Sequence, residues 1–244
     1  MSEYDELVER ARADDDVLGL ILTGSRGRNF RVRPDSDHDV RLVLRDNARD
    51  TYSTPHGSPV EVAALTRSEF ERTGLPGSGS EWDRYSYVRC ELVLDKLEGE
   101  LSRLVAAKAH LSEAEGRALA ASALDDYVNS YYRSARNHQN DLPFEARLDA
   151  AESVGSFLTA LFALHGRVRP FNKFLGWELQ LEPLGDEQWT VEALFPRLQR
   201  IVGPGDLGEQ QALFRDAELL ARGHGFGDVI DGWEPDVAWL RGRR

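Results

Sequence analysis

Three acidic residues lie in or beside segments that are otherwise typical of buried strands. Asp37 and Asp39 open the strand-like run 39–44, and Glu61 lies inside the apolar run 59–65. In a strand, residues i and i+2 point to the same face, so Asp37 and Asp39 present two carboxylates side by side. Two close carboxylates repel each other unless a cation lies between them, and Mg²⁺ prefers oxygen ligands. If the strands are neighbours, all three acids converge, which predicts catalytic and metal-binding roles for them.

A phosphate site is indicated just upstream of these acids. Gly24 and Ser25 follow the aliphatic run 17–23, where glycine allows a close backbone approach and N–H groups with a serine hydroxyl can hold phosphate oxygens. Four arginines follow within the same polar segment: Arg26, Arg28, Arg31 and Arg33. Each feature alone is also typical of an ordinary turn. Their conjunction with the acids predicts that Gly24, Ser25 and Arg28 bind the phosphates of a nucleotide.

The order of these motifs resembles the nucleotidyltransferase superfamily related to DNA polymerase β. The resemblance is carried by Gly24-Ser25, then eleven intervening residues, then Asp37-His38-Asp39-Val40, and finally Glu61 between two valines. It covers about residues 17–95 and is loose beyond. Small bacterial aminoglycoside nucleotidyltransferases with a helical C-terminal domain are the most similar members. His38 departs from the family, which prefers an apolar residue there, and Glu61 stands where many members have Asp.

The resemblance implies a mechanism. Asp37 and Asp39 would hold Mg²⁺ on the phosphates of ATP or another NTP, and Ser25 with nearby arginines would hold the outer phosphates. Glu61 would accept a proton from the attacking hydroxyl, the general-base role that is assigned to the similar Glu of streptomycin-modifying relatives. Alternatively, Glu61 would serve as a third metal ligand. Both roles remain open from the sequence. Transfer of AMP from ATP to a small, aminoglycoside-like acceptor is the expected reaction, with pyrophosphate released.

The helical half supplies further candidates. A polar stripe with spacing of three, four and three runs along one predicted helix and consists of Asp126, Asn129, Arg133 and Arg136. We expect Arg136, together with Lys173 in a Phe-Asn-Lys-Phe segment, to contact the triphosphate; lysines of helical domains in the superfamily often do so. Asp126 and Glu152 are candidate contacts to an amine of the substrate, and Glu152 is an alternative base. An ordinary solvated helix face explains the stripe equally well.

The elements that must position these residues change character near residue 100. Four strands are predicted over residues 17–23, 39–44, 59–65 and 87–95, with helices over 2–14 and after the capping-box pattern Thr66-x-x-Glu69. After residue 100, helices are predicted over 112–137, 144–165, 190–201 and 206–222, and a further helix is predicted to begin at Pro170. The C-terminal tail is expected to dock on the protein through Trp233 and Trp239.

Strands followed by a run of helices indicate an α+β protein with two segregated domains. We expect a nucleotidyltransferase catalytic domain with a mixed β-sheet over residues 1–100. An all-helical domain that binds substrate and nucleotide is expected over 101–244. The sequence leaves the oligomeric state open.

The amino-acid composition limits the classes of molecule that the protein is expected to bind. The 244 residues carry 30 basic and 42 acidic side chains, for a formal net charge of −12, which disfavours a broad nucleic-acid surface and favours a cationic substrate. An acidic surface also simply keeps proteins soluble. One cysteine, Cys90, excludes an internal disulfide, and no membrane span or secretory signal is expected, which predicts a cytoplasmic protein.

Two rival functions share these motifs. One is a nucleotidyltransferase that modifies a protein, as antitoxin-type relatives do, although those are often minimal catalytic domains. The other is a nucleotide-binding module that has lost its chemistry, against which the presence of all three acids argues.

Overall fold

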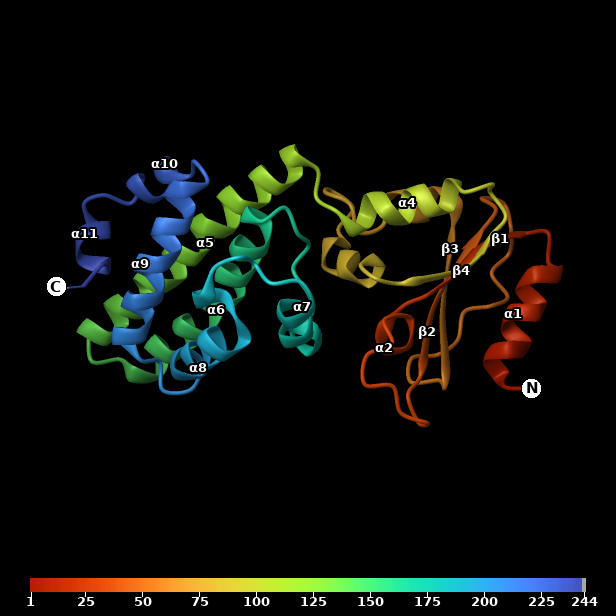
Figure 1. Ribbon diagram of the computed structural model, residues 1–244, viewed down its shortest axis with the longest axis horizontal. Coiled ribbons are helices and arrows are strands. Elements are labelled where there is room, and N and C mark those ends of the chain that lie inside the picture. Colours follow the sequence, from red (N-terminus) through yellow and green to blue (C-terminus); the bar gives the residue numbers. More distant parts are fainter. Residues whose placement is uncertain (243–244) are drawn as a thin grey trace. The chain divides into compact units, whose positions relative to one another are not determined.

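The computed structural model describes residues 1–242 and divides the chain into two compact units, Met1–His110 and Leu111–Arg244 (Figure 1). All strands of the described residues belong to the first unit, and the second is helical, so the α+β class expected from the sequence is confirmed. The predicted docking tail ends at Arg243 and Arg244, which lie outside the described residues.

A four-stranded mixed sheet forms the centre of the first unit. Its strands are β1 (Val17–Leu22), β2 (His38–Leu44), β3 (Val60–Thr66) and β4 (Glu91–Asp95), in the order β3-β2-β1-β4. β1 runs antiparallel to β2 and to β4, while β2 and β3 are parallel. The expected strand over 87–95 is therefore shorter than predicted. Residues Glu81–Tyr87 instead form 3-10 turns (η1), and Arg89 takes a left-handed φ of 54° before the strand begins.

Each face of the sheet has its own apolar core. Helix α1 (Glu3–Ala13) covers one face, where Leu7, Val8 and Ala11 pack with inward residues of β1, β2 and β3. The other face carries a smaller cluster that α3 (Arg67–Arg72), η1 and α4 (Glu100–Ala109) contribute to: Leu18, Ile21, Val43, Phe70, Tyr87 and Leu101. Because side chains alternate along β2, Val40 and Leu42 face α1, whereas Asp39 and Arg41 face the opposite side.

The first unit includes α4, whose first residue lies at the boundary predicted near residue 100. Leu101 of α4 is fully buried in the cluster with Ile21 and Tyr87, so the helix is part of the sheet's cover. The two units therefore divide after His110.

Three helices begin with capping boxes, including the one predicted at Thr66. Ser2, Thr66 and Ser112 each accept a hydrogen bond from the backbone N–H three residues on, and the acid at that position returns a bond to the cap's own N–H. These capping boxes satisfy N–H groups that the first turn of a helix leaves without partners.

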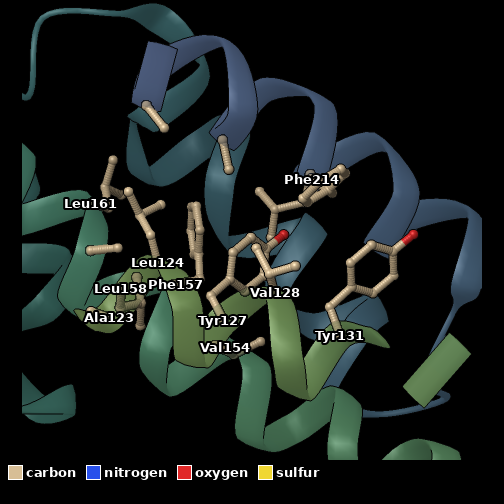
Figure 2. Packing of buried hydrophobic residues seen from close by; sticks show 14 of the residues in the cluster. Ala123, Leu124, Tyr127, Val128, Tyr131, Val154, Phe157, Leu158, Leu161 and Phe214 are labelled. Atoms are coloured by element: carbon tan, nitrogen blue, oxygen red, sulfur yellow. The ribbon is translucent and has the colours of Figure 1, made fainter. Parts of the chain in front are cut away.

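The second unit is organised around two long helices, α5 (Glu113–Gln139) and α6 (Pro143–Leu164), which pack against each other. Figure 2 shows Tyr127 and Tyr131 of α5 beside Phe214 of α9, and Phe157 of α6 lies beside Tyr127. The remaining elements are η2 (Asn172–Phe174), α7 (Leu175–Leu181), η3 (Glu187–Trp189), α8 (Val191–Val202), α9 (Leu207–Gly223), α10 (Gly227–Asp231) and α11 (Asp236–Leu240).

The C-terminal segment docks on α5 as expected. Trp233 and Trp239 both lie against Tyr132, with ring centroids 5.9 and 6.0 Å away. Trp233 also donates its indole N–H to Asp125, at 2.9 Å. In the described part of the chain, no helix combines the length and the apolar character that crossing a membrane requires.

Candidate functional site

The parallel pairing of β2 and β3 brings two of the predicted acids together. Asp39 and Glu61 are direct partners in the register, so their side chains project to the same face of the sheet. Asp37 precedes β2 and is exposed, while Asp39 and Glu61 are partly buried. The register therefore brings Asp39 and Glu61 together, as the strand pattern predicts, at the end of the face where the apolar cluster of α3, η1 and α4 stops, while Asp37 lies before the strand.

Gly24 lies directly against the Asp39 carboxylate. The residue before it, Thr23, donates both its backbone N–H and its hydroxyl to the carbonyl of Asp39, at 2.7 and 3.0 Å. A Cβ at position 24 would lie 1.8 Å from Asp39 Oδ2, and Gly24 has a φ of +62°. Only glycine fits both conditions. The glycine of the Gly-Ser pair is thus required by the carboxylate that it faces.

Ser25 and Arg28 form the turn that follows. Residues Gly24–Gly27 make one short helical turn, α2, and Ser25 within it is buried. Arg28 is also buried; its guanidinium donates to the carbonyls of Gly24 and Tyr85 and lies over the ring of Tyr85. This placement favours a role in holding the Gly24 turn over direct contact with a phosphate.

A cation that the sequence analysis passed over lies beside the acids. Arg41 is two residues after Asp39 on the same face of β2, and it pairs with the buried Asp83 of η1 at 3.2 Å. Its charge also acts on Glu61, where it helps to lower the pKa. The sequence already indicated this position for Arg41, because residues i and i+2 of a predicted strand project to the same face. The partner on η1 was not visible, since it is 42 residues away.

Glu61 is held in one orientation by the turn that precedes its strand. Its Oε2 atom accepts a hydrogen bond from the backbone N–H of Gly57 at 3.0 Å, and His56 Nδ1 lies 2.8 Å from the same oxygen. The Gly57 N–H, followed by the His56 contact, lowers the pKa of Glu61 below its ordinary value. Glu61 is therefore an ionised carboxylate at neutral pH, able to accept a proton or to bind a cation.

His56 has no predicted role in the sequence, yet it contacts the site. The hydrogen bond to Glu61 is the largest cause that raises the pKa of His56, and the charges of Asp37 and Asp39 add to it. All three acids therefore act on this one imidazole. The sequence feature that could have indicated this contact is the turn Pro-His-Gly-Ser-Pro, which lies immediately before the strand that carries Glu61.

The donor set fits a hard divalent cation. Carboxylate oxygens are the ligands that Mg²⁺ prefers, and it is commonly held by one or two carboxylates together with substrate phosphates. Within residues 1–242, no group of three or more His, Cys, Asp or Glu side chains is already arranged to hold a metal ion. Glu61 has its Oε2 engaged by His56 and Gly57. Asp37 and Asp39 are the carboxylates that the strand pattern assigns to such a cation.

His38, the departure from the family pattern, faces away from the acids. Its ring stacks on Tyr4 of α1, with centroids 4.4 Å apart and planes 13° from parallel. Burial is the largest cause that lowers the pKa of His38. An aromatic ring thus replaces an apolar side chain at a position that packs under α1.

The predicted residues of the helical half belong to the second unit. On α5, Asp126 and Arg136 are exposed, and Arg136 lies within hydrogen-bond distance of Gln139, at 3.3 Å. Glu152 of α6 is exposed and bonds to Arg133 of α5 at 2.6 Å. The stripe on α5 exists as predicted, and its contact with Glu152 is that of an interhelical ion pair on a solvated face.

Lys173 lies in η2, after a segment that an arginine fastens to α6. Arg169 donates to the carbonyl of Gly155 at 3.0 Å and to the side chain of Asn172 at 3.1 Å. Burial lowers the pKa of Arg169. Lys173 itself is exposed, with its ammonium 5.5 Å from the centroid of the Phe174 ring.

Comparison with solved structures finds a "nucleotidyltransferase-like protein from Exiguobacterium sibiricum 255-15" that aligns with this chain. The two sequences are 10% identical, the TM-score is 0.47, and the match covers 93% of this chain and 76% of the other. No protein-family model matches the chain, and no curated protein matches its sequence. The function is therefore inferred from the residues of the site.

Proposed function

We propose that this protein is a Mg²⁺-dependent nucleotidyltransferase that moves a nucleoside monophosphate, AMP from ATP, to a hydroxyl of a small acceptor. The observation that carries the proposal is the placement of the Asp39 carboxylate against Gly24, with Glu61 as its neighbour across the parallel strands. These are the three motifs by which the sequence resembles the superfamily related to DNA polymerase β.

Each residue has a role in this proposal. Asp37 and Asp39 hold the cation, which when bound neutralises phosphate charge and orients the donor. Ser25 and the exposed arginines Arg31 and Arg33 bind the outer phosphates. Glu61 accepts the proton of the acceptor hydroxyl while the hydroxyl oxygen forms a bond to the α-phosphorus of the NTP. The bond between the α-phosphorus and the pyrophosphate leaving group breaks.

The charge of the chain supports a cationic acceptor. With a formal net charge of −12, the protein attracts polyamines such as aminoglycosides and repels phosphate backbones. Asp126 and Glu152 are exposed carboxylates of the second unit that could bind amino groups of such a molecule.

The proposal is tested by measuring pyrophosphate release from each NTP with Mg²⁺ and a panel of aminoglycosides, with mass spectrometry of the acceptor. We expect acceptor-dependent release and an acceptor that gains one nucleoside monophosphate. Glu61→Gln should lower the turnover by about 10²–10⁴-fold, because the proton acceptor is removed. Glu9→Gln, on the exposed side of α1, serves as the control and should keep the wild-type rate.

Three results would change the conclusion. Wild-type turnover in Glu61→Gln would refute its role as base. Labelled nucleotide found on protein rather than on a small molecule would replace the acceptor by a protein. Absence of both nucleotide binding and pyrophosphate release with every NTP would contradict the enzyme class.

A further inference from the structure

We propose that His56 is a positioning residue that, together with the Gly57 N–H, fixes one oxygen of Glu61 and leaves the other for the acceptor hydroxyl. This inference rests on the proposed function, because it assigns a purpose to the orientation of the proposed base. It adds a residue to which the sequence motifs give no role.

Two donors converge on a single carboxylate oxygen. His56 Nδ1 lies 2.8 Å and the Gly57 nitrogen 3.0 Å from Glu61 Oε2. An ionised carboxylate only accepts hydrogen bonds, so Nδ1 of His56 must carry the proton and donate it. Within residues 1–242 the hydrogen bonds to the Glu61 side chain go to Oε2, and Oε1 is left to meet a substrate.

The turn that carries the donors is itself anchored on the strand of Glu61. Ser58 donates its hydroxyl to the carbonyl of Pro55 at 2.7 Å, and Gly57 supplies the left-handed φ of +85° that closes the turn. The Thr54 hydroxyl binds the backbone of the two residues that flank Glu61. It donates to the Val60 carbonyl and accepts from the Val62 N–H. The donors thus keep their position relative to Glu61.

The His56 side chain makes no packing contribution that would explain its presence. It is 95% exposed, whereas the Glu61 side chain that it contacts is 27% exposed. A substitution at His56 therefore changes the orientation of Glu61 without opening a cavity, which keeps the variants folded. Orientation matters for proton transfer, because a small misplacement of a reacting group can cost a large factor in rate.

The first test compares His56→Ala with His56→Asn in the transfer assay. The asparagine side chain carries an N–H donor at the place of Nδ1. We expect His56→Ala to lower kcat by about 10-fold with the KM for Mg²⁺-ATP unchanged, and His56→Asn to restore kcat to within about threefold of wild type. His110→Ala is the matched control, since His110 is an exposed histidine of the same unit that bonds locally to Ala106.

Wild-type kcat in His56→Ala would overturn the proposal. Equal losses in the alanine and asparagine variants would do the same, as would a change confined to KM.

A second readout does not depend on activity, so that failure of the positioning role and failure of the proposed function can be distinguished. Nitrogen-15 NMR of the full chain at a pH of about 9 reports which ring nitrogen of neutral His56 carries the proton. We expect Nδ1–H in the wild type and loss of that preference in Glu61→Ala. An Nε2–H imidazole in the wild type, or a pattern that Glu61→Ala leaves unchanged, would refute the contact whatever the enzyme does.

Discussion

The two units bury charged side chains in different ways. In the first unit, apart from the Arg41–Asp83 pair, the buried cations Arg28, Arg84 and Lys108 donate to backbone carbonyls. Lys108, for example, donates to those of Glu71 and Thr73. In the second unit buried acids pair with arginines, as Glu218 does with Arg222 and Arg241.

The difference follows from what each unit must hold in place. Cations that donate to carbonyls hold backbone segments that lack regular hydrogen bonding. Arg28 holds the Gly24 turn. Arg84 holds the end of α4 through the carbonyls of Ala107, Lys108 and His110. The ion pairs of the second unit join regular helices, as Arg241 after α11 is joined to α9. The buried cations of the first unit therefore fix turns and helix ends, whereas the ion pairs of the second unit join helices that already pack through apolar side chains.

The largest expected effect concerns packing in the second unit. Phe157 of α6 is buried between Tyr127 and Trp189, with ring centroids 5.4 and 5.7 Å away (Figure 2 shows its place beside Tyr127). Phe157→Ala should lower the free energy of unfolding by about 3–5 kcal/mol, because it removes apolar burial and leaves a cavity. Urea unfolding measures the loss.

The control for this prediction is Phe144→Ala at the start of α6, where the ring is 60% exposed. A loss in Phe157→Ala as small as in that control would contradict the view that packing holds the second unit.

A smaller effect concerns the buried cations of the first unit. Burial lowers the pKa of Lys108 from 10.5 to about 8. Between these values the unfolded chain keeps a proton that the folded chain has lost, so the free energy of unfolding rises with pH. The contribution is about 2 kcal/mol between a pH of about 7.5 and about 9.5.

Urea unfolding at both pH values, for the wild type and Lys108→Met, tests this contribution. The variant should be less stable, because two carbonyls lose their donor, and it should lack the part of the pH dependence that Lys108 supplies. Equal pH dependence in the two proteins would break the contrast between the units.

The sequence predicts those parts of the structure that local chemistry determines. Capping boxes mark the starts of α1, α3 and α5, and aliphatic runs mark β1 and β3. Alternation along β2 and β3 places Asp39 and Glu61 on one face, and the register confirms that they are neighbours.

The parts that were missed depend on the backbone or on distant partners. Helix α4 begins after Gly99, which has a φ of +86° and provides no side-chain cap, so no start signal exists. The strand predicted over 87–95 begins only at Glu91, because Tyr87 is the last residue of the 3-10 turns 81–87, through which it is buried. The contact of His56 with Glu61 requires the turn to fold back on its own strand, which residue types alone do not reveal.

The central claim is that Asp39, held against Gly24, supports the binding of a metal-nucleotide complex. Calorimetric titration with each NTP, with and without Mg²⁺, tests it on the wild type and on Asp39→Asn. Asp15→Asn is the matched control, an exposed carboxylate in the turn before β1. We predict Mg²⁺-dependent binding of one nucleotide by the wild type and the control, and its loss in Asp39→Asn. Wild-type affinity in Asp39→Asn, or binding that ignores Mg²⁺, would contradict the account.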